Sequence, residues 1–321
     1  MVRNTTGYNI YAEKRRMMRR DFVKFMSGEP FGHVTVLEGE AKDAPNFPYV
    51  TIVIPTLDAY RGGYFPELLE QIKRQTFQNF EVIIVKGDPR QGRAINTGVS
   101  LARGEIIITL DDDTRLGNEK VLENLVRVME EHPEIGMAGV SNLVPKDASW
   151  LVRRVMKEVP RRSSKLVDEI TESDMAEHPC CAIRKSVFLE VGGENELIPR
   201  GLDPYLRSEI RKAGYKVVVI PNTWIHHLPP NSLKKLIKQF FRNGKDAAYC
   251  NKFYPQWVIE TPDGHVGTFR EKVPIWFRWL RYAFRMLKAF FSFKWIYLLT
   301  MICYAAGFAW GYLILKERPD G

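Results

Sequence analysis

A chain of 321 residues, 45% hydrophobic and 12% aromatic, is long enough for one catalytic domain with appended segments, and this composition excludes an intrinsically disordered protein. Its formal net charge of +9 leaves nucleic acid and an anionic membrane surface open as partners. The four cysteines have no CxxC spacing, so we exclude a disulfide framework and predict reduced thiols in a cytosolic compartment. A zinc site at His178, Cys180 and Cys181 is the alternative.

The first 48 residues are predicted to form a basic N-terminal extension. Residues 8–26 alternate basic side chains with methionine and phenylalanine, which is typical of an amphipathic helix on a membrane or on the domain. Residues 39–48 are typical of a linker. Residues 1–30 contain no continuous apolar region, so we expect no secretory signal there.

The catalytic domain is predicted to span residues 49–270 and to have an α/β fold. Short apolar runs predict strands at residues 49–55, 80–85, 105–110 and 136–141. Helical patterns separate these strands, including one at residues 119–131. The alternation indicates a Rossmann-like, mostly parallel sheet with helices on both faces.

Polar residues follow three of these strands at the point where each strand ends. They are Pro55–Asp58, Lys86–Asp88 and Asp111–Asp113. In open α/β sheets, ligands bind beyond the carboxyl ends of the strands. We therefore expect all three groups to contribute to one site.

The triplet Asp111-Asp112-Asp113 predicts a metal site. Three carboxylates at the end of a hydrophobic strand repel each other and need either a cation or full hydration. Alternate residues of an extended chain point the same way, so Asp111 and Asp113 can share one face. Hard oxygen ligands suit Mn²⁺ or Mg²⁺. The alternative is a solvated acidic turn that also caps a helix.

Three stretches together resemble the family 2 glycosyltransferases of GT-A fold. They are VTIVIPTLD, QTFQNFEVIIV and RAINTGVSLARGEIIITLDDD, which carry the Pro-Thr strand end, the QT-x-x-NFE entry, the Ala-x-Asn-x-Gly helix and the DxD motif. The resemblance covers about residues 49–250. It implies a nucleotide-diphosphate sugar donor of the UDP or GDP type, bound by a donor half at residues 49–141.

The resemblance also implies roles for donor-binding residues. The expected set is Pro55, Thr56 and Asp58 beside the nucleoside, Asp88 on the base or ribose, Arg93 on the phosphates, Asn96 bracing the loop, and Asp111 and Asp112 on the donor side. The family has two acidic residues directly after its second strand, whereas this chain has Lys86-Gly87 before Asp88. Either Asp88 is shifted into that role, or this chain recognises the base differently from the family.

For the metal, the resemblance implies Asp113 as the direct ligand, with Asp111 as a ribose or metal contact. The family often places a metal-binding histidine after the strand at KVVVIPNTWI, where this chain has His226-His227. Adjacent residues in a strand face opposite sides, so we expect one of the two to bind, with a preference for His227. The alternative is a packing or surface histidine.

The acceptor half is predicted at residues 142–270, and Asp203 is the expected catalytic base. It opens a helix before the Ala-Gly-Tyr sequence, where the family has Glu-Asp and this chain has Leu202-Asp203. Transfer with inversion needs a carboxylate to take the proton of the acceptor hydroxyl. The alternative role for Asp203 is helix capping before Pro204. Residues 142–178 are expected on the acceptor side, without assigned residues.

A Gln-x-x-Arg spacing at Gln239 and Arg242 resembles that of membrane polysaccharide synthases. Asn243 follows where those enzymes have tryptophan, which argues against processive polymer synthesis. Arg242 is expected either to pair with donor phosphate or to be a surface cation.

The C-terminal part predicts membrane attachment. Residues 271–294 mix basic and aromatic side chains, as an interfacial helix does, and residues 295–315 contain no charge over a length that spans a bilayer. More lysine and arginine precede this segment than follow it in the tail at 316–321, which predicts a single-pass protein with its domain on the cytoplasmic face. A buried core helix is the alternative.

Together these patterns predict an inverting, metal-dependent sugar transfer to a membrane-associated acceptor, with a lipid-linked acceptor left open. A polyprenyl-phosphate glycosyltransferase or a polysaccharide synthase is the nearer alternative. A basic membrane- or nucleic-acid-binding protein without catalysis is the alternative from another class, although we expect no nucleic-acid partner. A nicotinamide oxidoreductase is excluded because PTLDAYRGG contains no GxGxxG after the first strand.

Overall fold

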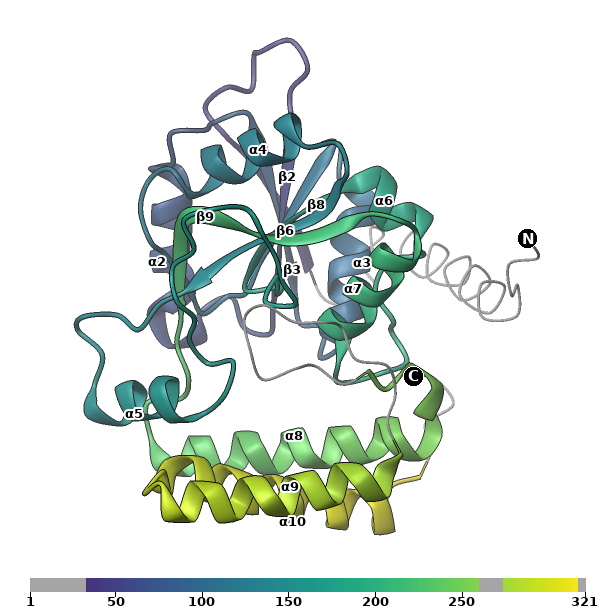
Figure 1. Cartoon of the computed structure of the whole chain (residues 1–321). Helices are drawn as coiled ribbons and strands as arrows, with labels where there is room; N and C mark the ends of the chain where they lie inside the picture. Colours follow the sequence, from purple (N-terminus) through teal and green to yellow (C-terminus); the bar gives the residue numbers. More distant parts are fainter. Residues whose placement is uncertain (1–32, 260–273, 317–321) are drawn as a thin grey trace.

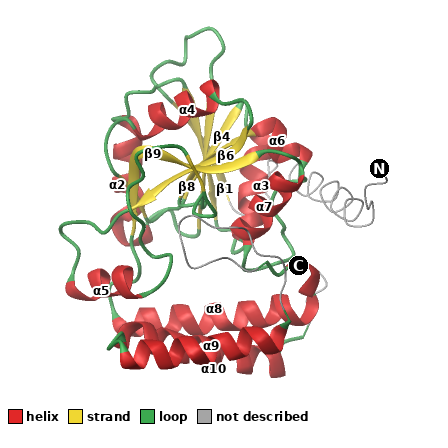
Figure 2. Ribbon diagram, in the orientation of Figure 1, coloured by secondary structure: helices red, strands yellow, loops and turns green. Residues whose placement is uncertain are grey.

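The computed structural model describes residues 33–259 and 274–316. A twisted sheet with helices on both faces stands above a separate layer of helices, as Figures 1 and 2 show. The predicted α/β class is confirmed. The expected amphipathic helix at residues 8–26 and the basic residues Arg270 and Lys272 lie outside the described residues.

The described strands form one sheet in the order β1-β3-β2-β4-β8-β6-β9-β5, with β7 paired to β9. Their bounds are β1 His33–Glu38, β2 Val50–Thr56, β3 Phe80–Lys86, β4 Ile106–Leu110, β5 Thr114–Leu116, β6 Ile135–Asn142, β7 Thr171–Glu172, β8 Cys180–Arg184 and β9 Lys216–His227. The four strands predicted between residues 49 and 141 correspond to β2, β3, β4 and β6. Strands β3, β2 and β4 are parallel, so their carboxyl ends meet at one edge.

Two features of the sheet differ from the sequence prediction. The sheet is mixed rather than mostly parallel, because β8 runs antiparallel between β4 and β6, and β5 and β7 pair antiparallel with β9. The sheet also begins before the predicted boundary at residue 49, since β1 pairs antiparallel with β3 from His33↔Lys86 to Glu38↔Glu81. This short strand covers the edge of β3, which would otherwise present unpaired backbone groups.

Helices cover both faces of the sheet with apolar side chains. On one face, α2 (Tyr64–Lys73) and α4 (Val121–Glu131) pack with Leu68, Leu122 and Leu125 fully buried. On the other face lie α3 (Gln91–Leu101), α6 (Lys185–Glu190) and α7 (Leu202–Lys212), with Ile95 and Leu206 fully buried. Each helix buries one stripe of its surface, as its sequence period predicts.

The separate layer contains α8 (Leu233–Phe253), α9 (Ile275–Phe291) and α10 (Trp295–Ile314), which lie side by side below the sheet (Figure 1). Helix α5 (Trp150–Glu158) connects this layer to the domain through Val155, which packs with Leu236 of α8 and Ile296 of α10. Two short 3-10 turns, η1 (Arg61–Gly63) and η2 (Pro255–Trp257), complete the described elements.

One glycine in the sheet permits a close approach that no side chain allows. A Cβ atom on Gly139 of β6 would lie 2.4 Å from Cα of Ala176. Gly139→Val should therefore destabilise the fold by about 2–3 kcal/mol through overpacking and lower the midpoint of thermal unfolding by several degrees. Circular dichroism checks this, with Ser100→Val on exposed helix surface as the control that should change the midpoint little. Equal midpoints for the two variants would contradict this packing.

Candidate active site

The acidic triplet lies between β4 and β5, at the edge where the parallel strands end. Asp112 turns toward β2, where it accepts a hydrogen bond of 2.7 Å from the Thr56 hydroxyl. Asp111 and Asp113 turn the other way, toward His227 at the end of β9. The alternation expected of an extended chain thus separates Asp112 from the other two carboxylates.

Asp111, Asp113 and His227 form a group that could hold a metal ion. One ligand atom from each lies within 4.8 Å of the other two. The His227 Nε2 is 3.1 Å from Asp113 Oδ1 and 3.7 Å from Asp111 Oδ2. His226 faces away, because its Nδ1 is 2.7 Å from the backbone oxygen of Leu143. Two carboxylates and one imidazole are ligands that suit Mn²⁺ or Mg²⁺, so the residues fit the expected cation.

The electrostatics of this group also favour a cation. Burial raises the pKa of Asp111 to about 7, and the charge of Asp113 adds to this effect. Burial alone would raise the pKa of Asp113 as well, but His227 and Arg61 hold it below its ordinary value. Arg61 reaches Asp113 Oδ2 with its Nη2 at 2.6 Å. A divalent cation between the carboxylates would favour the ionised form of both.

The expected nucleoside side lies in the turn that follows β2. Asp58 accepts backbone hydrogen bonds from Tyr60 at 2.9 Å and Arg61 at 2.8 Å, which lower its pKa and fix the turn. Pro55 is the penultimate residue of β2, and Thr56 ends the strand beside the triplet. Arg61 therefore joins two parts of the site: its backbone N–H bonds to Asp58 in the turn, and its guanidinium contacts Asp113 of the acidic triplet.

Asp88 and Arg93 bind each other at the start of α3. The Arg93 guanidinium donates to both carboxylate oxygens of Asp88, at 2.6 and 2.8 Å. In this structure Asp88 is therefore a partner of Arg93, whereas the sequence analysis expected Arg93 to face the donor phosphates. Asn96, one turn further along α3, exchanges hydrogen bonds with the backbone of Glu194 at 2.9 and 3.0 Å. That contact is what the expected bracing of the loop requires.

The expected base Asp203 lies in the first turn of α7 beside a buried histidine. Asp203 Oδ1 accepts a 2.7 Å hydrogen bond from the backbone N–H of His178, and the His178 Nδ1 is 3.6 Å from the same oxygen. The other imidazole nitrogen is 2.9 Å from Glu194, which is fully buried. The side chain of Asp203 keeps 30% of its surface exposed, so an acceptor can reach it.

Two buried cations set the protonation of Asp203. Burial by itself raises the pKa of Asp203, but His178 and Arg207 more than offset this, so the pKa lies below its ordinary value. Asp203 and Glu194 in turn raise the pKa of His178 well above its ordinary value, against the effect of burial. The charge of His178 lowers the pKa of Asp111 and the charge of Asp203 raises it, so both residues lie close enough to the metal group to affect its ionisation.

Arg162 lies on the expected acceptor side, in the range 142–178 where the sequence analysis assigned no residue. The backbone oxygen of Arg162 accepts a hydrogen bond from Asn142 at 3.0 Å, and the same Asn142 side chain accepts one from the backbone N–H of His227 at 3.0 Å. The Arg162 guanidinium lies over the ring of Phe240, 5.6 Å from its centroid. Burial and the nearby charge of Arg200 lower the pKa of Arg162.

Sequence reasoning thus missed several residues of the site: Arg61, Arg162, His178 and Glu194. Arg61 lies five residues after the end of β2, so its position near a strand end could have indicated that it belongs to the site. His178 was considered only for zinc, but its ring faces Glu194, and neighbouring Cys180 and Cys181 are buried within the sheet. Arg242 lies exposed on α8.

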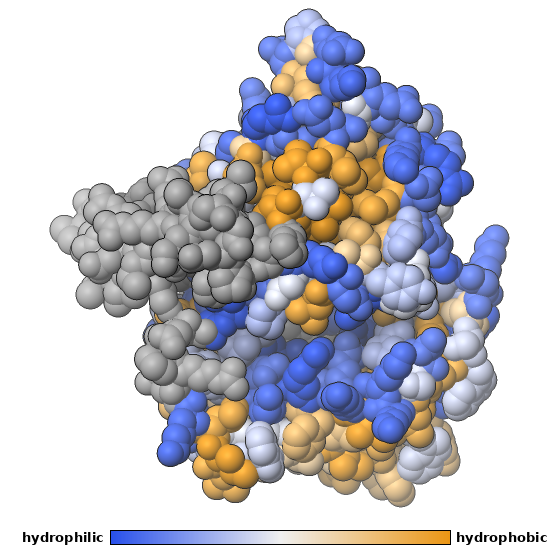
Figure 3. All heavy atoms as spheres, turned by 180° about the vertical axis from the view of Figure 1, so that it is seen from behind, coloured by the Kyte–Doolittle hydropathy of each residue, from blue (hydrophilic) through white to orange (hydrophobic). Residues whose placement is uncertain are grey.

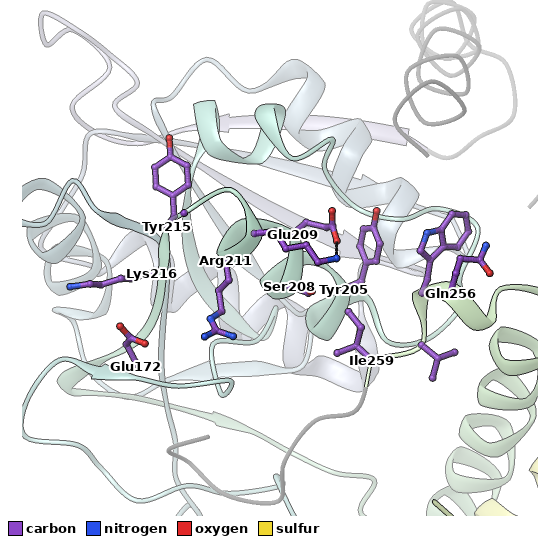
Figure 4. Close-up of a pocket in the computed structure, with 13 residues that line it drawn as sticks. Glu172, Tyr205, Ser208, Glu209, Arg211, Tyr215, Lys216, Gln256 and Ile259 are labelled. Atoms are coloured by element: carbon purple, nitrogen blue, oxygen red, sulfur yellow. Dashed lines mark hydrogen bonds and ion pairs between the residues drawn. The ribbon is translucent and has the colours of Figure 1, made fainter. Parts of the chain in front are cut away.

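A large hollow lies elsewhere on the molecule (Figure 4). Its volume is about 670 Å³, and its lining includes Tyr205, Ser208, Glu209, Arg211, Lys216 and Gln256. It contains none of the predicted site residues, although it shares helix α7 with Asp203. The strand-end group is therefore separate from this hollow.

Comparison with known proteins finds similarity to glycosyltransferases. Residues 86–192 match the description "Glycosyl transferase family 2". An uncharacterized glycosyltransferase of Haemophilus influenzae is 26% identical over 183 residues, which cover 49% of this chain and 59% of that protein. The O-antigen chain rhamnosyltransferase RfbN of Salmonella typhimurium is 22% identical over 226 residues, which cover 61% of this chain and 71% of that protein. Residues 86–192 therefore match a glycosyl transferase family 2 domain, in agreement with the resemblance seen in the sequence, and the chain spans 59% of the length of the first of these relatives.

Two solved structures bound to nucleotide sugars resemble this chain distantly. The mannosyltransferase PcManGT from Pyrobaculum calidifontis, in complex with GDP-Man and Mn²⁺, has a TM-score of 0.48 at 14% identity and covers 98% of this chain and 86% of its own. Residues 1–349 of TarS from S. aureus, in complex with UDP-GlcNAc, have a TM-score of 0.43 at 13% identity and cover 63% and 66%. At these scores the two structures carry no argument about the substrate of this chain.

Proposed function

We propose that the chain transfers a sugar from a nucleotide-diphosphate sugar to a membrane-associated acceptor, with inversion and with Mn²⁺ or Mg²⁺ as cofactor. The observation that supports this most is the group of Asp111, Asp113 and His227, whose ligand atoms lie within 4.8 Å of one another. Asp111 and Asp113 belong to residues 86–192, which match glycosyl transferase family 2. Asp203 adds an accessible carboxylate in the same electrostatic site.

Each residue of the proposed site has a distinct role in the transfer. A bound divalent cation would neutralise the diphosphate as it departs. Asp203 takes the proton of the acceptor hydroxyl while that oxygen bonds to the anomeric carbon on the face opposite the diphosphate, so the configuration inverts. The cations His178 and Arg207 keep Asp203 ionised at neutral pH. Thr56, Asp58 and Asp88 bind the nucleoside side of the donor.

The acceptor is proposed to be membrane-associated and anionic. Arg162 and Arg200 lie over the rings of Phe240 on α8 and Tyr304 on α10, at the junction between the site and the layer of helices. Guanidinium groups in this position suit the phosphate of a lipid-linked acceptor that offers a separate sugar hydroxyl as the nucleophile. The free cysteines Cys180, Cys181, Cys250 and Cys303 support a location of the domain in the reducing cytoplasm.

Thermal stabilisation by a panel of donors tests the proposal. With Mn²⁺ present, a true donor among UDP- and GDP-sugars at saturating excess should stabilise the protein by a few kcal/mol, because it binds only the folded state. Free sugars and nucleoside monophosphates are the controls, and we expect little from them. Stabilisation by RNA, together with no response to any nucleotide sugar, would instead favour a basic binding protein without catalysis.

A further inference from the structure

Helix α10 lies along α8 in close contact. A Cβ on Gly307 of α10 would lie 2.0 Å from the backbone oxygen of Phe241, and one on Gly244 of α8 would lie 2.0 Å from that of Tyr304. Further along, Gly311 approaches Lys245. Small residues at these positions let the two backbones approach as closely as packed helices can. Leu236 packs with Ile296 near the start of both helices and Lys252 bonds to Leu315 near their ends, so α8 and α10 run parallel.

Both ends of α10 are bonded to polar groups of the rest of the molecule. At its start, the buried Glu158 of α5 accepts hydrogen bonds from the backbone N–H groups of Ile296 at 3.0 Å and Tyr297 at 3.3 Å. At its end, Lys252 of α8 donates to the backbone oxygens of Tyr312 and Leu315, each at 2.9 Å. A carboxylate at the N-terminus and a cation at the C-terminus both complement the helix dipole.

Helix α8 cannot enter the hydrocarbon of a membrane. It carries seven charged side chains over its length: Lys234, Lys235, Lys238, Arg242, Lys245, Asp246 and Lys252. Charged residues are strongly disfavoured in the bilayer centre. The C-terminal half of α8 also packs on the catalytic domain, where Cys250 contacts Leu202 and Tyr205 of α7. Because α10 follows α8 from end to end, α10 cannot cross a bilayer while it keeps these contacts.

The face of the layer that points away from the domain is apolar. On α9, five side chains recur at helical spacing and are 59–74% exposed: Trp276, Leu280, Phe284, Leu287 and Phe291. On α10, Ile302 and Leu313 are 50% and 80% exposed. Figure 3 shows hydrophobic side chains gathered along the lower edge, where the layer lies. Basic residues flank the stripe on α9: Arg278, Arg281, Arg285 and Lys288.

We infer that α8, α9 and α10 form an in-plane membrane-docking layer whose apolar face, on α9 and α10, inserts into one leaflet of an anionic bilayer without spanning it, while α8 stays outside the hydrocarbon. An apolar stripe flanked by arginine and lysine is the pattern of a helix lying in the headgroup region. The anionic lipid surface is favoured over a protein partner because cationic side chains border the exposed stripe. This inference is independent of the proposed sugar transfer and replaces the spanning orientation expected for residues 295–315.

Cysteine labelling in membranes tests the orientation directly. Ser292→Cys and Lys316→Cys place exposed thiols on either side of α10, in a Cys303→Ala background whose other cysteines are buried. A membrane-impermeant maleimide should label both positions in inverted vesicles and neither in right-side-out vesicles. Ser100→Cys on the catalytic domain is the control and should label with them. Labelling of the two positions from opposite sides would overturn the inference in favour of a spanning helix.

Vesicle flotation tests the proposed lipid surface. The wild-type protein should float with phosphatidylglycerol-containing vesicles and far less with pure phosphatidylcholine, and Phe284→Glu combined with Leu287→Glu should reduce flotation at least tenfold. Leu189→Glu, at an exposed apolar position of α6, is the matched control and should not change it. Equal flotation of the double variant and the wild type, or formation of a stable dimer without any lipid binding, would contradict the docking layer.

Discussion

Asp203→Asn should lower the rate of sugar transfer by roughly 10²–10⁴-fold and leave donor binding unchanged. The amide keeps the shape of the side chain and can still accept the hydrogen bond from the His178 backbone, but it cannot take a proton. The carboxylate lies in the first turn of α7, so the same substitution also removes a charge that favours the helix N-terminus. That loss affects stability by a small amount and not the chemical step.

Measured kcat, donor affinity and unfolding midpoint together separate the two roles. Glu209→Gln is the matched control, because it makes the same change of acid to amide on the same helix, where Glu209 pairs only weakly with Lys212 at the surface. We expect wild-type turnover from this control. If Asp203→Asn turns over like the wild type, Asp203 is a helix-capping residue and another group takes the proton.

Asp113→Ala should abolish the dependence of donor binding on metal. Asp113 is the carboxylate closest to His227, at 3.1 Å, and its low pKa means that it is ionised and ready to bind a cation. Loss of one of three protein ligands should weaken cation affinity by about 100-fold or more, since even the groups that orient ligands contribute 10–100-fold. The diphosphate would then meet uncompensated negative charge from Asp111.

Isothermal titration of a nucleoside diphosphate, with Mn²⁺ and with a chelator, measures this effect. Wild-type protein should bind more tightly with Mn²⁺, and Asp113→Ala should bind equally weakly in both conditions. Asp147→Asn removes an exposed carboxylate paired with Arg115 and serves as the control that retains metal dependence. Unchanged binding by Asp113→Ala would remove Asp113 from the metal site.

Local patterns were sufficient to predict β2, β3, β4 and β6, but not the short strands β1, β5 and β7. Short β-branched runs located β2, β3 and β4, and the alternation of side chains in extended chain separated Asp112 from Asp111 and Asp113. The neighbour of Asp203 could not be predicted in this way. His178 lies 25 residues before it and reaches it only because β8 pairs with β4 in antiparallel register, Leu110↔Cys180. A sequence period carries no information on such pairing.

The helical layer shows a different limit of sequence reasoning. Residues 295–314 have the length and apolarity to span a membrane, and the helix was predicted at those residues. Its direction relative to the domain depends on Gly244, Gly307 and Lys252, which lie in two segments separated by more than 40 residues. Hydropathy describes one segment at a time, so it cannot distinguish a helix that crosses a bilayer from one held along its surface.

Release of nucleoside diphosphate from donor sugars tests the central claim most directly. The purified protein would be supplied with UDP- and GDP-sugars and membrane lipid extract, with Mn²⁺, with Mg²⁺ or with chelator, and both the nucleotide and the labelled lipid would be quantified. We predict that one donor yields nucleoside diphosphate and labelled lipid in equal amounts, only when the cation is present. Transfer that continues undiminished in chelator, or no release from any donor with either cation, would contradict a metal-dependent glycosyltransferase.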